Sequence, residues 1–248
     1  MLTELATALI GFLAGLADFS VGAGFDALAV PSLILIGVDP QMAIAEGLFA
    51  QVVSSTFFGV IKRRVILSRS GLVVIAASSS SALALSLLSL SLNRAVVEAA
   101  VGSVLLMLSS VLVLKVVGSS TTVSDPPVGE GRLAALALGA GAVKGLAGSG
   151  MSAVMMLGQL VMGVGMGRAV VMAVVSKSIP ATAALLPRAL GGGLDIVGAV
   201  ALAVGAIASI TVAERVRAVL SPKLLGSVLC CYSAAVGSYL VLKAAGIV

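Results

Sequence analysis

Five charged side chains lie inside stretches of sequence that are otherwise apolar enough to enter a membrane. These are Asp18, Asp26, Glu46, Lys144 and Lys177. Placing a charge in hydrocarbon costs about 2.5–3.5 kcal/mol on membrane-insertion scales, so such residues persist where they pair or contact water. Their usual role is to line the pathway of a substrate or an ion. The sequence therefore predicts a polar site within a membrane domain.

The surroundings of these charges recur at a fixed interval of 126 residues. Under this shift, without a gap, the matched pairs are Gly15 and Gly141, Gly22 and Gly148, Gly24 and Gly150, Gly37 and Gly163, Ala43 and Ala169, Thr56 and Thr182, and Lys62 and Arg188. One register held from residue 15 to residue 62 indicates two copies of one unit. Internal duplication of this kind is typical of membrane transporters.

Two of the charges are cations, and their counterparts under the shift differ. Lys144 corresponds to Asp18, and Lys177 corresponds to Gln51. Inverted repeats place equivalent positions across a pseudo-two-fold axis, so Asp18 and Lys144 could face one another as a structural ion pair or as part of a substrate site. Lys177 has no acidic counterpart and is the stronger candidate to bind an anion. Pairing with Glu46 or extension to the membrane surface are its alternatives.

Each unit contains a glycine-rich break, and a short helix is expected to begin after Gly24 in the first unit and after Gly150 in the second. The free N–H groups and positive dipole end of a helix N-terminus favour an anion. In the first unit this helix start carries Asp26, which could cap it. In the second unit it carries Ser149 and Ser152, which are neutral donors. We therefore expect the anion at the second break, near the two lysines.

The candidate substrate ligands combine the lysines, the glycine breaks and polar residues of the segment 41–61. Hydroxyl groups in the middle of a helix most often bond the backbone of their own helix, which is the alternative for the serines. The complete set is Lys177, Lys144, Ser149, Gly150, Ser152, Gly24, Gln51, Ser54 and Ser55.

The three carboxylates within the membrane segments are candidates to carry a coupling proton or another cation. They are Asp18, Glu46 and Asp26. Apolar surroundings favour the protonated form of a carboxyl group, which suits a proton-coupled carrier. The same pattern is consistent with Na⁺ coupling or with uncoupled flow, so these options stay open.

Composition places the chain among integral membrane proteins. Of its 248 residues, 60% are hydrophobic and 10% are charged, and the mean hydropathy is +1.23. A soluble domain carries about 25% charged residues. The net charge of +5 does not indicate nucleic-acid binding, because aromatic residues make up only 3% and no basic face is present. The chain has no histidine, an adjacent pair of cysteines and no nucleophile motif with a base, so we expect no enzyme, metal or cofactor.

The expected fold is an all-α integral membrane protein with two inverted-topology repeats, each a glycine-broken helical hairpin plus three transmembrane helices. The first repeat, 1–117, is expected to comprise a broken hairpin at 5–37 and spans at 41–61, 71–92 and 95–117. After a linker at 118–132, the second repeat, 133–248, is expected to comprise a broken hairpin at 133–163 and spans at 167–187, 195–213 and 224–245. A break at membrane depth is tolerated only where it is buried in protein or lines a cavity.

The charges of the loops predict an orientation in the membrane. If each hairpin returns to its starting side, each repeat crosses an odd number of times, and the two repeats are inverted. Ten of the fifteen Lys and Arg residues then lie on the side of the linker, against Arg94, Arg188 and Lys243 on the other side. Because cations favour the cytoplasmic side, we expect a multi-pass plasma-membrane protein with a cytoplasmic linker 118–132 and both termini outside. Surfaces of small residues would also allow a homodimer.

A series of motifs recurs in both units. In the first unit they are, in order, Gly11 to Gly15, Gly22-Ala23-Gly24, Pro31, Gly37, Pro40 and Ala43. This series resembles the repeat signature of the sulfite exporter TauE/SafE family: a G-x-x-x-G helix, a glycine-rich break, a proline, a short G-x-x-P turn and an alanine-rich span ending in basic residues. The second unit keeps the glycines but has Leu157 where the first has Pro31, and Asp195 resembles the aspartate that often follows this span.

The chain also departs from that signature. It has Phe25-Asp26 where a third glycine is usual, and Asp18, Glu46 and the two membrane lysines are not part of the general pattern. Charges at these positions could define a subgroup with its own substrate.

The resemblance implies a secondary transporter, often an exporter, of small sulfur oxyanions or organosulfonates. We expect a substrate such as sulfite or a sulfonate to move by alternating access around a site between the two broken hairpins. The alternative is a proton- or cation-linked carrier of another small anion or solute that uses Asp18 and Glu46. The sequence leaves open the sulfur compound, the direction, the coupling ion and the oligomeric state.

Overall fold

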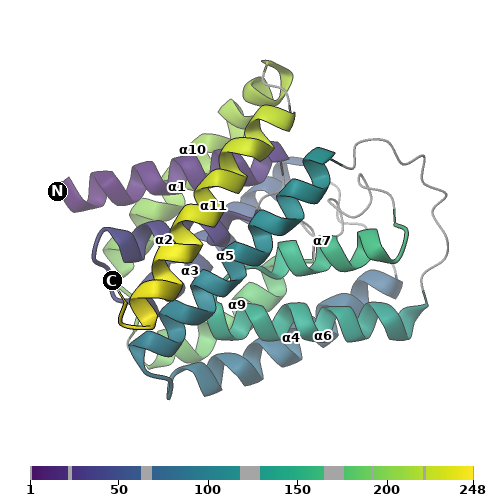
Figure 1. Cartoon of the computed structure of the whole chain (residues 1–248), viewed down its shortest axis with the longest axis horizontal. Helices are drawn as coiled ribbons and strands as arrows, with labels where there is room; N and C mark the ends of the chain where they lie inside the picture. The colour runs from purple at the N-terminus through teal and green to yellow at the C-terminus, as the bar shows by residue number, and fades with distance from the viewer. Residues whose placement is uncertain are drawn as a thin grey trace.

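The computed structural model describes the chain apart from residues 1, 22–23, 63–68, 118–128, 165–175, 192, 220–221 and 248. Every regular element in this part of the chain is an α-helix, as predicted (Figure 1). The helices are α1 (Leu2–Val21), α2 (Phe25–Leu35), α3 (Pro40–Lys62), α4 (Arg69–Ser89), α5 (Arg94–Val117), α6 (Glu130–Ala147), α7 (Met151–Val161), α9 (Ser178–Leu190), α10 (Ile196–Val219) and α11 (Pro222–Ala244).

The two arms of each predicted broken hairpin differ in length. α1 has 20 residues and α6 has 18, whereas α2 and α7 have 11 each. At about 1.5 Å per residue, the first arms approach the thickness of a bilayer core and the second arms cover about half of it. The first hairpin is predicted to begin at residue 5, whereas α1 begins at Leu2.

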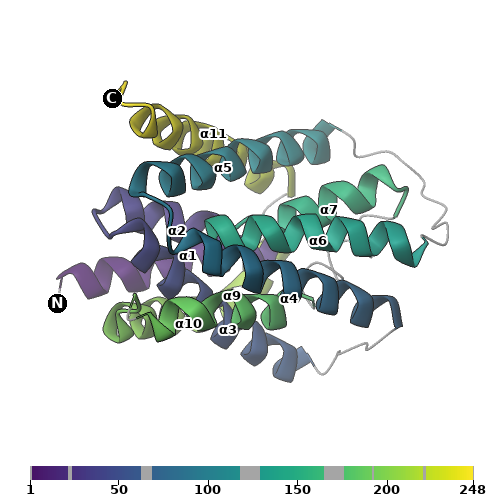
Figure 2. The same cartoon turned by 90° about the horizontal axis from the view of Figure 1, so that it is seen from below.

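α2 lies in the middle of the bundle (Figures 1 and 2). Nine of its eleven residues are buried, and apart from Asp26 and Ser32 its whole circumference is apolar. Such a helix is stable only when other elements enclose it. α3 approaches it closely at Gly47, where an added Cβ would lie 2.7 Å from Val30 Cγ2.

Helix positions in the two halves of the chain correspond at the predicted interval. α2 begins and ends 126 residues before α7. Gly24 and Gly150 have φ values of 89° and 84°, and Gly37 and Gly163 have values of 96° and 81°. A positive φ is strained for residues with a side chain, so both halves need glycine at the same two places. The inverted orientation of the halves stays a prediction.

Three pairs of long helices pack side by side: α1 with α10, α4 with α6, and α5 with α11 (Figures 1 and 2). Glycine allows their backbones to approach. A Cβ added to Gly205 of α10 would lie 1.9 Å from the carbonyl oxygen of Ala8, and one added to Gly141 of α6 would lie 2.2 Å from that of Ser78. Small residues at such interfaces let membrane helices pack closely.

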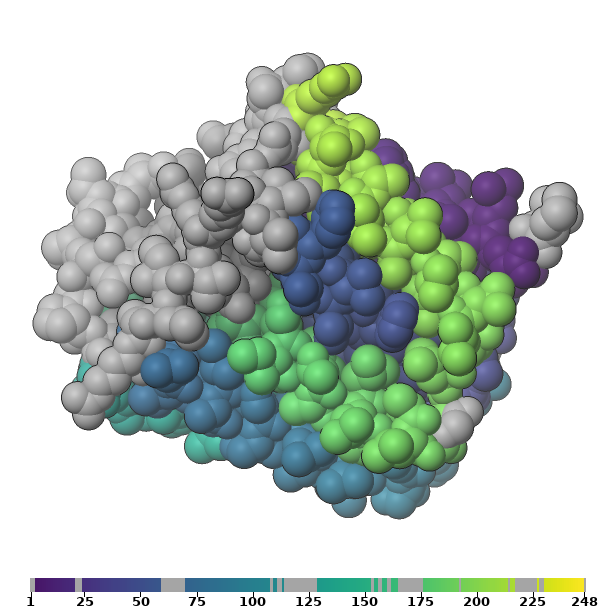
Figure 3. Space-filling model, turned by 180° about the vertical axis from the view of Figure 1, so that it is seen from behind, coloured from purple at the N-terminus to yellow at the C-terminus, as the bar shows by residue number. Residues whose placement is uncertain are grey.

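α3 and α9 lie between two of these pairs. α3 packs against α10 and α9, and α9 packs against α4, so the four helices follow one another across one face of the molecule (Figure 3). Fully buried apolar side chains contribute to this packing, among them Ile44 and Leu48 of α3 and Ala181 and Ala184 of α9. This arrangement brings polar residues of α3 and α9 to the inside of the bundle.

Three helices in the described part of the chain are long and apolar enough to cross a membrane, at Thr3–Ser20, Ser70–Ser89 and Ile196–Ala213. One side of α1 exposes leucines at positions 5, 9 and 13, which are 54–69% accessible and suited to contact with lipid. Both termini lie at the same end of the bundle (Figures 1 and 2).

The predicted span 195–213 matches the apolar stretch Ile196–Ala213, which is long and apolar enough to cross a membrane, but the helix that contains it is longer. α10 continues through Glu214 and Arg215 to Val219, into the segment predicted to be a basic turn. Glutamate and arginine are good helix formers, and a long cationic side chain can reach the membrane surface from within a helix. The change from apolar to charged residues along the sequence therefore does not mark the end of this helix.

The predicted span 167–187 lies partly outside the described residues, and the helix that is described there, α9, begins only at Ser178. Pro180 lies in the first turn of α9, where its missing N–H group costs no intrahelical hydrogen bond.

We expect Gly205→Ala to lower the free energy of unfolding by about 1–3 kcal/mol, because the new methyl group would overlap the Ala8 carbonyl oxygen. Gly139→Ala is the matched control, since no atom lies within 4 Å of a Cβ added there. This variant should be neutral or slightly stabilised, because alanine favours a helix. Thermal unfolding of both variants in one detergent would measure the difference, and equal melting temperatures would contradict the contact.

Candidate functional site

Two buried ion pairs lie inside the bundle. Lys144 Nζ is 2.7 Å from Asp26 Oδ2, and Lys177 Nζ donates a hydrogen bond to Asp18 Oδ2. All four side chains are at most 2% exposed. Lys144 also interacts electrostatically with Lys177 and Asp18, so the four residues form one group, which we call the central charge cluster. Its formal charges sum to zero, as expected for ions withdrawn from water.

Asp18, in the last turn of α1, also binds the backbone of the first glycine break. Its Oδ1 accepts a hydrogen bond of 3.0 Å from the N–H group of Gly24, the residue that precedes α2. An anionic side chain thus occupies the position at the N-terminus of α2 where an anion is favoured.

Asp26 does not cap α2, in contrast to one of the interpretations of the sequence. Its Oδ1 accepts a hydrogen bond of 2.7 Å from Gln51 Nε2 of α3, while its Oδ2 faces Lys144 of α6. Gln51 Oε1 accepts a further hydrogen bond from Lys144 Nζ. α2, α3 and α6 are therefore joined by one closed polar triangle.

The predicted pairing of Asp18 with Lys144 is wrong, because Lys144 pairs with Asp26 and Asp18 pairs with Lys177. Equivalent positions of two copies meet only where they lie close to the axis that relates the copies, and sequence spacing does not reveal that distance. The prediction that Lys177 has no acidic partner is also wrong, because Lys177 pairs with Asp18. Lys177 directly precedes α9, and its backbone carbonyl accepts a hydrogen bond of 3.0 Å from Ala181 N–H.

The second glycine break lies beside the first. A Cβ added to Gly24 would be 3.6 Å from the Cβ of Ser152, in the first turn of α7. Ser149 and Ser152 are 1% and 6% exposed, and the Ser149 hydroxyl is buried without a hydrogen-bond partner. Within the described residues, no acceptor is present for the N–H group of Gly150. The second break therefore has unused donors in the Ser149 hydroxyl and the Gly150 N–H group.

The two predicted serine ligands of α3 differ from each other. Ser54 donates to the carbonyl oxygen of Gln51 over 3.4 Å, as expected for a hydroxyl group inside a helix. Ser55 is 8% exposed, and its buried hydroxyl has no hydrogen-bond partner. Neither serine makes a hydrogen bond to a member of the central charge cluster in the described part of the structure.

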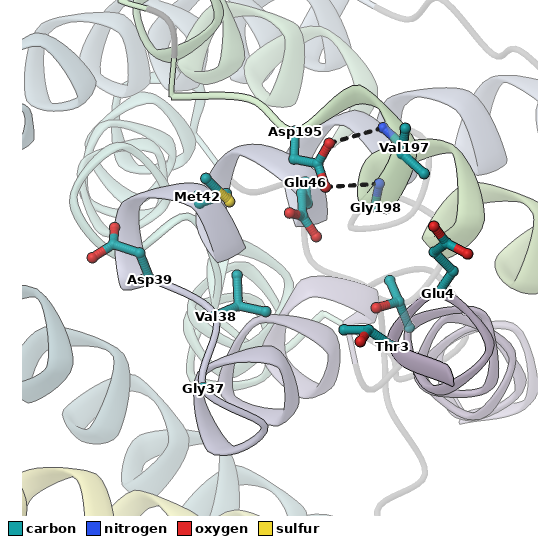
Figure 4. A pocket seen from close by; sticks show the side chains of 11 residues that line it. Thr3, Glu4, Gly37, Val38, Asp39, Met42, Glu46, Asp195, Val197 and Gly198 are labelled. Atoms are coloured by element: carbon teal, nitrogen blue, oxygen red, sulfur yellow. Dashed lines mark hydrogen bonds between the residues drawn. The ribbon is translucent and has the colours of Figure 1, made fainter. Parts of the chain in front are cut away.

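Glu46 lies away from the central charge cluster, beside a pocket of about 430 Å³ between the start of α1, the α2–α3 turn and the start of α10 (Figure 4). Its carboxylate neighbours that of Asp195. In the residues that the structure describes, no group of three or more His, Cys, Asp or Glu could hold a metal ion.

Arg188 of α9 is a buried cation that the sequence analysis placed at a membrane surface. It is 1% exposed and donates to the Ser86 hydroxyl, to the Ser89 hydroxyl at 2.6 Å and to the Gly145 carbonyl at 2.8 Å. The C-terminal ends of α4 and α6 carry negative partial charge and unpaired carbonyl groups, which stabilise the guanidinium group. The spacing of the two serines on α4, three residues apart, is the only signal of this site in the sequence.

We expect Lys144→Met to destabilise the protein by about 3–5 kcal/mol, because Asp26 would be left buried without its counter-charge. The double variant Asp26→Asn/Lys144→Met should recover most of this loss, since no unpaired charge is left. Chemical denaturation in detergent would compare the two. Lys243→Met is the matched control, because Lys243 pairs with Glu98 at 3.3 Å but is 31% exposed, and such a pair contributes about 0–1 kcal/mol. Equal losses for the single and double variants would contradict this account of the cluster.

The comparison with protein families matches residues 7–240 to a family described as "Sulfite exporter TauE/SafE". Neither the comparison with curated proteins nor that with solved structures found a match. The matched range includes both glycine breaks and the central charge cluster, and it confirms the resemblance seen in the sequence motifs. Together with the apolar helices, the match indicates a membrane protein from a family of transporters. The chain therefore belongs to the sulfite exporter TauE/SafE family.

Proposed function

We propose that this protein is a secondary transporter that exports a small sulfur-containing anion, such as sulfite or an organosulfonate, and binds it at the second glycine break. The family supports transport of a sulfur anion. The observation that carries the location is the Ser149 hydroxyl, which is buried beside the break without a hydrogen-bond partner. A buried donor without an acceptor is unfavourable, and an oxyanion would satisfy it.

The difference between the two breaks supports this location. In the first break, Asp18 accepts a hydrogen bond from Gly24 N–H and supplies the negative charge from within the chain. The residue 126 positions after Asp18 is Lys144, so the second break has a cation where the first has an anion. A substrate oxyanion at the N-terminus of α7 would supply negative charge and accept hydrogen bonds at the second break, as the Asp18 carboxylate does at the first.

The lysines can contribute without losing their aspartates. An ammonium group has three N–H donors. Within the described residues, Lys144 uses two of them, for Asp26 and Gln51, and Lys177 uses one, for Asp18. The remaining donors could bind an anion held near the second break, together with Ser152 and Gly150.

Alternating access would arise from two inverted repeats, 1–117 and 133–248. In this scheme α1, α2, α4 and α5 are the counterparts of α6, α7, α10 and α11. The packing supports the scheme, because α1 contacts α10 while its counterpart α6 contacts α4, the counterpart of α10. In this scheme a helix of each unit packs against a helix of the other unit, so that the two units would surround the central charge cluster. We further propose a multi-pass plasma-membrane protein with a cytoplasmic linker 118–132 and outside termini; a homodimer stays a prediction.

We expect Ser149→Ala to weaken sulfite binding by about tenfold to a hundredfold, because a hydrogen bond to a charged group contributes about 1.5–3 kcal/mol. The melting temperature without ligand should not fall, since the hydroxyl has no partner to lose. Thermal shift of the purified protein with sulfite, sulfate, thiosulfate, sulfoacetate, taurine and acetate would measure both quantities. A ligand at a hundred times its dissociation constant stabilises by about 2.7 kcal/mol.

Ser103→Ala provides the control for this experiment. Ser103 is exposed on α5 and bonds the Ala99 carbonyl of its own helix, so its variant should bind sulfite like the wild type. Stabilisation by a sulfur anion that is the same in Ser149→Ala and in wild type would reject the second break as the site. No stabilisation of the wild type by any sulfur anion would count against the proposed substrate class.

A further inference from the structure

The pocket beside Glu46 lies at the end of the bundle where α1, α3 and α10 begin, and its charged lining residues are all acidic. They are Glu4 of α1, Asp39 of the α2–α3 turn, Glu46 of α3 and Asp195, which precedes α10. Figure 4 shows these side chains around one space, with Glu46 and Asp195 next to each other. Among the described residues that line this pocket there is no lysine or arginine.

Glu46 is the buried member of this group. It is only 3% exposed, and no hydrogen bond or ion pair joins its carboxylate to another residue in the described part of the chain. Its nearest charged neighbour is Asp195, which lies against the same glycine: a Cβ added to Gly198 would be 2.9 Å from Glu46 Oε2 and 3.0 Å from Asp195 Oδ2. A largely buried carboxylate that accepts no hydrogen bond and lies beside a like charge is unfavourable in its ionised form.

The other acidic groups of the pocket are exposed, and two of them accept hydrogen bonds. Asp195 is exposed and accepts hydrogen bonds of 3.1 and 3.2 Å from the N–H groups of Val197 and Gly198 at the N-terminus of α10. Asp39 accepts one of 2.9 Å from Gln41 N–H at the start of α3 and also interacts with Arg94. Glu4 is exposed on α1. Glu46 is therefore the carboxylate of this pocket whose negative charge is least stabilised by its surroundings.

We propose that Glu46 and Asp195 form a proton-binding site at this pocket, and that the proton on Glu46 accompanies the transported anion. The second part rests on the proposed function, whereas the proton site itself does not. Charge balance supports the coupling, because the central charge cluster is already neutral and a bound anion would add an uncompensated negative charge. Glu46 is five residues from Gln51 on α3, about 7.5 Å along the helix, and Gln51 bonds both Asp26 and Lys144.

Infrared titration of the purified full-length protein would detect the proton directly. A protonated carboxyl group has a carbonyl band that an ionised one lacks. We expect wild type to show a band near neutral pH that is lost as the pH rises, and Glu46→Gln to lack it. Glu46→Gln should also fold as well as wild type, because its side chain is neutral and of similar shape.

Asp195→Asn tests the role of the neighbouring charge. Without that charge, proton affinity at Glu46 should fall, so the band should be lost at lower pH than in wild type, while the effect of burial is unchanged. Asp39→Asn is the matched control: it removes a charge from the same pocket but not one beside Glu46, and should shift the titration much less. A band unchanged in Glu46→Gln, or an equal shift in both aspartate variants, would overturn the site.

Proteoliposomes test the coupling. We expect wild type to move sulfite faster under a pH gradient, while Glu46→Gln keeps sulfite exchange but loses the response to the gradient. An unchanged response in Glu46→Gln would overturn the coupling role. If wild type moved no sulfite but showed the infrared signature, the proposed function would fail and the proton site would stand.

Discussion

Mutual neutralisation of buried charge is the constraint on which this structure depends. Asp18, Asp26, Lys144 and Lys177 are almost completely enclosed, and any one of them without its partner would cost several kcal/mol. Both aspartates come from the first half of the chain and both lysines from the second. The two halves therefore cannot slide along one another without separating opposite charges, and any motion that carries a substrate has to keep these charges paired or replace one partner.

Glycine makes that pairing possible. The break before Gly24 lets α2 start in the interior, where Asp26 reaches Lys144 and where Asp18 binds the freed backbone. Gly47, Gly141 and Gly205 bring helices close enough for short side chains to meet across their interfaces. The same residues that reduce helix propensity thus set the geometry of the polar centre. The second break shares this geometry but lacks the internal carboxylate, which is why the proposed substrate site lies there.

Arg188 and Glu46 show two different ways of holding a buried charged group. Arg188 is surrounded by hydroxyl and carbonyl oxygens from α4, α6 and α9, so its charge is stabilised and its role is to hold helices together. Among the described residues Glu46 has no such donors, and its carboxylate lies next to that of Asp195 on the lining of a pocket. A buried charge that is stabilised by hydrogen bonds is suited to a structural role. A buried carboxylate without hydrogen bonds is suited to binding a proton from solution.

The sequence by itself determined the helical membrane character of the chain, the places where its helices break and the charges that had to be accommodated inside. These are local properties: hydropathy, glycine at positions of positive φ, and the high cost of each intramembrane charge can be read residue by residue. Only the tertiary structure decided which charges meet. It paired Asp18 with Lys177 rather than Lys144, buried Arg188 and placed Asp195 beside Glu46, because such contacts depend on how helices distant in sequence are rotated and packed.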